Sequence, residues 1–252
     1  MKARHLNDLT VVMTWYGQEN HLFNQMQFYN SMAQRYPKLT PRLIVINDGH
    51  EKGREYFHEV IKVHRDRFDL TGIDVLKDVG FNSHACRNLG VKQCKTDWML
   101  LMDVDCFESE GMYKYMRFFK DLNPDMYYVP KADMEMPEQM GAYELLCPKG
   151  IVKYKTHPNT WIMTKEAYWS TGGYDMEFAG MRHGDKEFWT SIDKEKYEHF
   201  LFHPELEEEF DIHVRQPNRT KSYLNQTTEH VGYLKNCVDF VAERNDDKVR
   251  KH

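Results

Sequence analysis

The residues of this sequence best suited to chemistry are two aspartates, Asp103 and Asp105, one residue apart. They follow the most apolar run of the chain, residues 97–102, which predicts a buried strand with both carboxylates near its end. Hard cations such as Mg²⁺ and Mn²⁺ prefer carboxylate and phosphate oxygens, so such a pair can hold a metal against a diphosphate. Taken alone, so short a pattern also fits a solvated acidic turn. The position of the two aspartates at a strand end favours a metal site over an acidic turn.

The elements that must position these aspartates alternate between short apolar runs and helical patterns. The apolar runs predict strands over residues 9–14, 42–46, 73–76 and 97–102. The spacing of apolar residues between them predicts helices over residues 22–36, 57–64 and 83–94. Strands separated by helices imply a mostly parallel sheet with right-handed crossovers. Ligands bind such sheets beyond the carboxyl ends of the strands, and the polar segments fall there, at residues 14–20, 47–49 and 103–105.

Beyond the fourth strand the pattern is less regular. Apolar spacing predicts a helix over residues 112–122, and short apolar runs predict strands over residues 126–129 and 160–163. Between these strands, residues 131–158 contain three prolines and two glycines. We therefore expect an irregular excursion over the active face.

Size, charge and cysteine usage narrow the class of protein. The chain of 252 residues is long enough to bury a substantial core, and its net charge of -5 weighs against a protein that coats nucleic acid or a membrane. No run of about 18 apolar residues occurs, so we expect no transmembrane segment, and the N-terminus lacks a signal-peptide core. The five cysteines form no Cys-x-x-Cys pair, which predicts reduced thiols, a cytoplasmic location and no cysteine-ligated zinc.

Several short blocks stand in a fixed order between residues 9 and 190. Around the two aspartates lie residues 80–90, which end in Arg87-Asn88-Leu89-Gly90, and residues 96–105. The outer blocks are Thr14, Glu19 and Asn20 after the first strand, Asp48 after the second, and Thr171-Gly172-Gly173-Tyr174-Asp175-Met176-Glu177-Phe178. Together these blocks resemble the central and acceptor-side motifs of family 2 glycosyltransferases.

The resemblance implies the GT-A fold of nucleotide-diphospho-sugar transferases, an α/β architecture whose mostly parallel central sheet is flanked by helices. We expect one domain over residues 1–252, since no repeat or linker divides the chain. Residues 1–105 would form the donor half, and residues 106–252 the acceptor half with a C-terminal extension. The resemblance also implies Mn²⁺ or Mg²⁺ as cofactor and a nucleotide-diphosphate-sugar as donor, with a UDP-sugar as the family default.

The resemblance assigns the nucleoside end of the donor to the loops after the first two strands. Thr14 and Tyr16 would flank the base, with Glu19 in the same loop, and Asp48 would accept a hydrogen bond from the base or ribose. Asp48 could instead be a turn former after its strand.

The resemblance assigns the phosphate end of the donor to the central block, residues 80–90 and 96–105. Asp103 would lie near the ribose or sugar and serve with Asp105 as a metal ligand. Arg87 would contact phosphate or sugar or hold the aspartates in place; a plain ion pair is the alternative. Asn88 is expected to be structural, bonding the backbone near the turn. A further ligand would be a histidine, and the candidates are His203, His213 and, in the most motif-like setting, His230.

The acceptor side would supply the general base of an inverting reaction. Inverting members carry an aspartate after the Gly-Gly-Tyr-Asp block, commonly within Glu-Asp, and Asp185 lines up with it while Gly184 replaces the glutamate. A carboxylate at a helix start can take a proton from an acceptor hydroxyl, or it can simply cap the helix predicted over residues 186–192. Glu187 is the reserve candidate, and His183 beside the base could reach the donor phosphates.

Further acceptor-side residues follow from the same block. Gly173, Tyr174 and Asp175 belong to it, and Trp161 lies in the strand before it. Trp161 and Tyr174 would be aromatic platforms for sugar or base, or core residues.

Two other functions compete with a metal-dependent glycosyltransferase. A sugar nucleotidyltransferase would need a glycine-rich phosphate loop with a basic signature near the first strand, which residues 14–18 do not supply. The third hypothesis is a non-catalytic module that binds nucleotide-sugar or glycan on the same fold. Gly184, which stands in place of the usual glutamate, is compatible with it. The acceptor is open between a glycan, a small molecule and modified nucleic acid, and no obligatory protein partner is inferred. Basic residues that could meet a polyanion, or form a solvated face, are Arg215, Arg219, Lys221, Lys248, Arg250 and Lys251.

Overall fold

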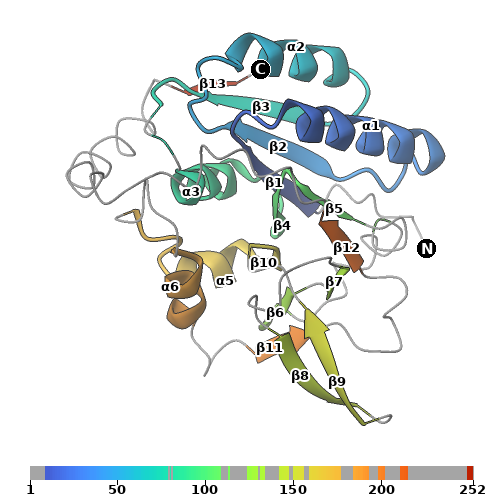
Figure 1. The fold of residues 1–252 in the computed structure, drawn as a ribbon, viewed down its shortest axis with the longest axis vertical. Coiled ribbons are helices and arrows are strands. Elements are labelled where there is room, and N and C mark those ends of the chain that lie inside the picture. Colours follow the sequence, from blue (N-terminus) through green and yellow to red (C-terminus); the bar gives the residue numbers. More distant parts are fainter. Residues whose placement is uncertain are drawn as a thin grey trace.

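Figure 1 shows the computed structural model of this protein. The structure describes residues 9–78, 80, 82–108, 113, 124–129, 131–133, 142–147, 150–155, 159–176, 184–192, 198–201, 211–214 and 249–251. Of the expected helix over residues 112–122, only Tyr113, which is helical and buried, lies among the described residues.

The first hundred residues form a regular alternation of strands and helices. The elements are β1 (Leu9–Trp15), α1 (Glu19–Arg35), β2 (Arg42–Asn47), α2 (Arg54–His64), β3 (Leu70–Val75), α3 (Ser83–Gln93) and β4 (Trp98–Asp103). Strand β1 pairs in parallel with β2 and β4, and β2 pairs in parallel with β3. The four strands and three helices expected from the sequence are confirmed.

Strand β3 begins at Leu70, three residues before the expected Ile73. Gly72 obscured this strand, because glycine weakens a strand pattern. The structure gives its reason: a Cβ at Gly72 would come within 2.8 Å of Ile61. Glycine here lets α2 pack closely on β3.

The later elements extend this sheet and add two smaller sheets. They are β5 (Cys106–Glu108), β6 (Met126–Val129), β7 (Lys131–Asp133), β8 (Ala142–Cys147), β9 (Gly150–Lys155), β10 (Trp161–Thr164), α5 (Lys165–Ser170), α6 (Gly184–Ser191), β11 (Glu198–Leu201), β12 (Asp211–Val214) and β13 (Val249–Lys251). Within the described part of the chain the central sheet has the order β11-β6-β10-β4-β1-β2-β3-β13, with β10 antiparallel to β4. Strands from both sides of residue 105 therefore share one mostly parallel sheet, as expected.

The expectation of an irregular excursion over residues 131–158 was wrong. Strands β8 and β9 form an antiparallel pair, from Ala142 opposite Lys155 to Cys147 opposite Gly150, and β7 pairs with β12. The proline and glycine that suggested irregularity mark the ends of these strands: Pro148 follows β8, and Gly150 is the first residue of β9. Residues 142–147 and 150–155 are therefore regular strands.

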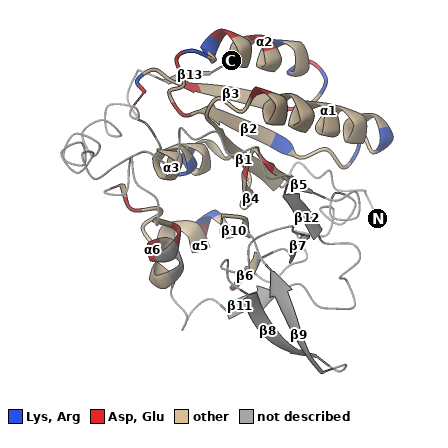
Figure 2. Cartoon of the chain, in the orientation of Figure 1, with Lys and Arg blue, Asp and Glu red and all other residues tan. Residues whose placement is uncertain are grey.

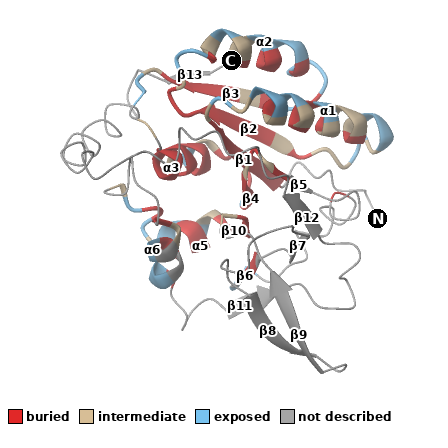
Figure 3. Ribbon diagram, viewed as in Figure 1, coloured by how far each residue is buried: buried red, intermediate tan, exposed pale blue. Residues whose placement is uncertain are grey.

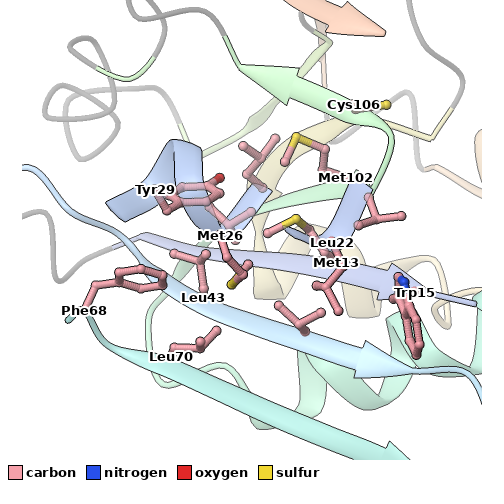
Figure 4. Close-up of a cluster of buried hydrophobic side chains, with 14 of the residues drawn as sticks. Met13, Trp15, Leu22, Met26, Tyr29, Leu43, Phe68, Leu70, Met102 and Cys106 are labelled. Carbon is pink, nitrogen blue, oxygen red and sulfur yellow. The ribbon is translucent and has the colours of Figure 1, made fainter. Parts of the chain in front are cut away.

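The two faces of the sheet bury two apolar clusters, because side chains alternate across a strand. Leu9, Val11 and Met13 of β1 pack with α1 and α2 in one cluster, which Figure 4 shows from close by. Val12 points to the opposite face and packs with residues of α3, α5 and α6. Figure 3 shows how burial concentrates in β1, β2, β4 and α3. None of the helices in the described residues has the length and apolar character to cross a bilayer.

Helix α3 lies unusually close to the sheet. A Cβ built at Gly90 would stand 2.3 Å from Cγ1 of Val12 in β1. Only glycine allows this approach, which brings the side chains of α3 up to the carboxyl ends of β1 and β4.

Candidate active site

The carboxyl ends of the parallel strands place the candidate donor residues along one edge of the sheet. In the register of the sheet, Thr14 of β1 stands opposite Asp103 of β4, and Trp15 stands opposite Asn47 of β2. Asp48 directly follows Asn47, and its backbone N–H donates to the carbonyl of Trp15 at 2.9 Å. Residues from three strands are therefore brought together, as the sequence predicts.

Arg87 of α3 joins the two ends of the site. Its Nη2 pairs with Oδ1 of Asp103, and its Nη1 donates to Oδ1 of Asp185 at 3.1 Å. The Arg87 side chain is only 1% exposed, and its guanidinium lies 5.1 Å from the ring centre of Tyr174. Arg87 thus contacts one of the two adjacent aspartates, Asp103, and the candidate base, Asp185. Figure 2 shows acidic residues, in red, on α6.

Arg87 carries a secure positive charge. Burial would lower its pKa, but the negative charges of Asp103 and Asp185, together with the nearby Tyr174, raise it above the ordinary value. The two carboxylate partners offset the cost of removing the guanidinium from water.

Asp103 has a second partner that the sequence did not reveal. Nδ2 of Asn159, just before β10, donates to Oδ2 of Asp103 at 2.9 Å. Asn159 falls outside every motif, so only the antiparallel pairing of β10 with β4 brings it to this carboxylate. Both oxygens of Asp103 therefore make protein contacts that fix its orientation.

Asp105 is the more suitable of the two aspartates for a metal. Burial and, next, the negative charge of Asp103 raise the pKa of Asp105 to about 7, against a smaller lowering by its own backbone N–H, the Cys106 thiol and Arg87. Arg87 offsets the charge of an anionic carboxylate in this place only in part, and a hard divalent cation would supply further positive charge through oxygen ligands. The residues present thus fit Mn²⁺ or Mg²⁺.

A third protein ligand is not found in the described part of the chain, where no three His, Cys, Asp or Glu residues gather in a metal-binding group. His203 and His230 lie outside the described residues, and of His213 the structure describes only the backbone, in β12 opposite Phe107. The histidine ligand therefore stays a prediction.

Asp48 ties the second strand to the start of α3. Its side chain is 2% exposed; Oδ2 accepts from the backbone N–H of Asn82 at 2.8 Å, and Oδ1 accepts from the Cys86 thiol at 3.1 Å. The turn behind it depends on Gly49, whose φ is +76° and where a Cβ would lie 2.4 Å from the carbonyl oxygen of Lys77. Asp48 thus has a structural role at the edge of the site, whether or not it also contacts a base.

The loop after β1 contains a polar aromatic cluster. The Tyr16 hydroxyl donates to Oδ2 of Asp78 at 2.9 Å, and its ring centre lies 4.9 Å from that of His50. Burial, followed by the hydrogen bond to Asp78, raises the pKa of Tyr16. Tyr16 is half-buried, while Glu19 is exposed in the first turn of α1. Sequence reasoning found Tyr16 but missed His50 and Asp78, which stand in loops after other strands.

Asn88 holds the acceptor-side block against α3. Its Nδ2 donates to the carbonyl of Tyr174 at 2.8 Å, and its Oδ1 accepts from the Tyr174 N–H at 2.9 Å. Gly173 has a φ of +78°, and a Cβ there would lie 2.6 Å from Oδ1 of Asn88. The expected structural role of Asn88 is confirmed, and the Gly-Gly-Tyr block is shaped to meet it.

The two aromatic candidates lie in the core. Trp161 is fully buried in β10, with its ring 5.6 Å from that of Phe188. Tyr174 is also buried; its ring stacks on that of Phe188 at 4.4 Å and lies next to the Arg87 guanidinium. Asp175, the next residue, is exposed.

Asp185 enters the site from the first turn of α6. This helix begins at Gly184, two residues before the expected start. Oδ1 of Asp185 accepts from Arg87 and also lies 3.7 Å from Nε2 of His84. Glu187, the reserve candidate for the base, is exposed on the same helix, and His183 lies outside the described residues.

Comparisons with known proteins concern the family resemblance and the fold. Residues 10–124 match the family model described as glycosyltransferase like family 2. Among curated protein sequences, none matches the chain significantly. The resemblance inferred from the motifs is confirmed over the matched segment, which contains Asp48, Arg87, Asp103 and Asp105.

Several solved structures share the fold at low sequence identity. TarS 1–349 of S. aureus, in complex with UDP-GlcNAc, is 12% identical with a TM-score of 0.57, over 93% of this chain and 66% of that one. GalNAc-T7 with UDP, GalNAc and Mn²⁺ is 14% identical with a TM-score of 0.56, over 93% and 48%. The mannosyltransferase PcManGT from Pyrobaculum calidifontis, in complex with GDP-Man and Mn²⁺, is 13% identical with a TM-score of 0.57, over 84% and 58%. This chain spans about half to two thirds of their lengths, and its fold is GT-A.

Proposed function

We propose that this protein is a metal-dependent glycosyltransferase that moves a sugar from a nucleoside-diphosphate sugar to an acceptor hydroxyl. One observation carries the proposal: Arg87 joins Asp103, from the end of β4, to Asp185, from the start of α6. A cation site and a candidate base thereby meet at the edge of the sheet where α/β proteins bind ligands. A UDP-sugar is our first choice of donor, and a GDP-sugar is the second.

The metal and the donor diphosphate belong to the β4 end of the site. Asp105, with Asp103 beside it, would hold Mn²⁺ or Mg²⁺, and His230 is the proposed third ligand. When bound, this cation offsets the charge that develops on the departing nucleoside diphosphate. Arg87 and Asn159 keep the Asp103 carboxylate in one orientation, so the protein side of the site is set before the donor arrives.

Asp185 is the proposed general base. The acceptor oxygen forms a bond to the anomeric carbon, the bond from that carbon to the diphosphate oxygen breaks, and the acceptor proton moves to Asp185. Attack from the side opposite the diphosphate inverts the anomeric centre. Arg87 stabilises the ionised carboxylate before the transfer, because it donates a hydrogen bond to Oδ1 of Asp185.

The nucleoside end belongs to the loops after β1 and β2. Thr14 and Tyr16 would flank the base, Glu19 stands at the start of α1, and Asp48 would accept from the base or ribose. The hydroxyl of Tyr16 is held by Asp78, which orients the ring.

The division of the chain follows from these assignments. Residues 1–105 would form the donor half, and residues 106–252 the acceptor half with Trp161, Gly173, Tyr174 and Asp175. The acceptor would be a glycan, a small molecule or a modified nucleic acid, and the first two need no polyanion-binding surface.

A panel of UDP- and GDP-sugars with Mn²⁺ tests the function through donor binding and release of the nucleoside diphosphate. We expect one donor to be hydrolysed slowly, and Asp105→Ala and chelation to stop the reaction. The matched control is Asp97→Asn, because Asp97 is exposed beside the other end of β4. Tight binding without turnover, over a broad acceptor panel, would instead support a non-catalytic binding module.

The base is assigned by comparing two variants of helix α6. Asp185→Asn should lower kcat by about 100-fold or more with little change in donor affinity, because general acid–base catalysis contributes roughly 10²- to 10⁴-fold. Glu187→Gln should stay near wild type. The reverse result would move the base to Glu187.

A further inference from the structure

Gly184 is the one position where the acceptor-side motif departs from its expected acid, and the structure shows why glycine is needed there. A Cβ at Gly184 would lie 2.8 Å from Nε2 and 2.9 Å from Cε1 of His84. Real Cβ atoms do not approach other atoms this closely, and His84 is completely buried in α3. The imidazole therefore occupies the space that a side chain at residue 184 would need.

The imidazole that takes this space also reaches the candidate base. Nε2 of His84 lies 3.7 Å from Oδ1 of Asp185, and Nη1 of Arg87 donates to the same oxygen at 3.1 Å. His84 and Arg87 are three residues apart on α3, so they project from the same face of the helix. Two groups on one rigid helix thus lie beside Oδ1 of the carboxylate, Arg87 through a hydrogen bond and His84 at 3.7 Å.

A second contact keeps the imidazole in place. The ring of His84 lies 5.2 Å from that of Tyr174, and Tyr174 in turn packs on Phe188 of α6 and under Arg87. The ring is held between α3 and α6, so its distance to Asp185 is set by the packing of these two helices.

We propose that His84 is a positioning residue for Asp185, and that it replaces the acidic side chain that precedes the base in the family motif. This inference rests on the proposed function, in which Asp185 accepts the acceptor proton. Its basis is the pairing of a buried imidazole with a glycine: His84 fills the volume at residue 184 and holds the carboxylate that follows. An apolar side chain of equal size would fill the same space without a polar contact to Asp185.

Two substitutions separate positioning from space filling. His84→Gln places an amide nitrogen near the position of Nε2, whereas His84→Met has a similar volume but no hydrogen-bond donor. We expect His84→Met to lower kcat by about 10- to 100-fold, the cost of a misplaced catalytic group, with donor Kd changed less than about 3-fold. His84→Gln should restore most of the lost kcat. Equal kcat in wild type and His84→Met would overturn the proposal.

A stability measurement tests the steric part without any turnover. Gly184→Ala should lower the Tm of the wild-type protein and be tolerated in the His84→Ala background, where the imidazole is absent. An equal loss of Tm in both backgrounds would show that His84 does not impose the glycine, which overturns the pairing.

The activity data also separate this inference from the proposed function. If wild type binds and turns over no nucleotide-sugar, the proposed function fails, and the role of His84 in it fails too. If wild type turns over a donor and Asp185→Asn does not, the function stands, and only the response of the His84 variants decides the inference.

Discussion

The raised pKa of Asp105 makes the stability of the metal-free protein depend on pH in a defined direction. Burial and the charge of Asp103 raise this pKa from 3.8 to about 7. The folded state therefore binds a proton that the unfolded chain has lost, between about pH 4 and about pH 7. This contribution to stability is fully present below the lower value and disappears as pH rises through about 7.

Asp105→Asn removes the titration and measures its size. The two pKa values differ by about 3 units, and each unit corresponds to about 1.4 kcal/mol, which gives about 4 kcal/mol as an upper value. Partial contact of the carboxylate with solvent reduces it, so we expect about 2 to 4 kcal/mol. The unfolding free energy of the variant, minus that of wild type, should increase by this amount from about pH 4 to about pH 8.

Urea unfolding in EDTA across this pH range is the assay, with Asp97→Asn as an exposed control whose difference from wild type should stay constant. Adding Mn²⁺ at about pH 8 should then stabilise wild type, by about 2.7 kcal/mol at a hundred times its Kd, and leave Asp105→Asn unchanged. A stability difference that does not vary with pH, or an equal response of both proteins to Mn²⁺, would refute the reasoning.

Two further substitutions test the framework of the site. Arg87→Lys keeps a positive charge but loses the planar fork that reaches both aspartates, so we expect a loss of about 3 kcal/mol in urea unfolding, near the cost of breaking a buried ion pair; an unchanged midpoint would contradict the bridge. Gly49→Ala should cost about 3 kcal/mol, because its φ is positive and its Cβ would meet the carbonyl oxygen of Lys77. Gly172→Ala, with a positive φ but open space around the Cβ, should cost about 1 kcal/mol, and equal losses would show that the contact at Gly49 is unimportant.

The sequence predicts the donor half of the fold well because its signals are local. The apolar runs that became β1, β2 and β4 lie between helices with regular spacing, and each signal depends only on neighbouring residues. The hairpin of β8 and β9 was missed because proline and glycine were counted over the whole stretch, when their positions, beside Cys147 and at Gly150, mark strand ends.

The site shows the same limit. Asp103, Arg87 and Asp185 were found through motifs, but their mutual contacts depend on how α3 and α6 approach the sheet. Asn159 stands outside every motif, and His84, although it lies within the block of residues 80–90, was given no role, because only tertiary packing brings these two residues to the aspartates. The departure at Gly184 was visible in the sequence, yet its cause lies in a residue a hundred positions earlier in the chain.

Helix α3 explains why so many parts of the site depend on one short element. Gly90 sets the depth of the helix against Val12, and any side chain there would push α3 away from β1. Because the helix is rigid, such a shift would move Arg87 from both aspartates and Asn88 from Tyr174 at once. The Arg-Asn-x-Gly motif is thus one positional device, in which the glycine fixes the distance that the arginine and the asparagine use.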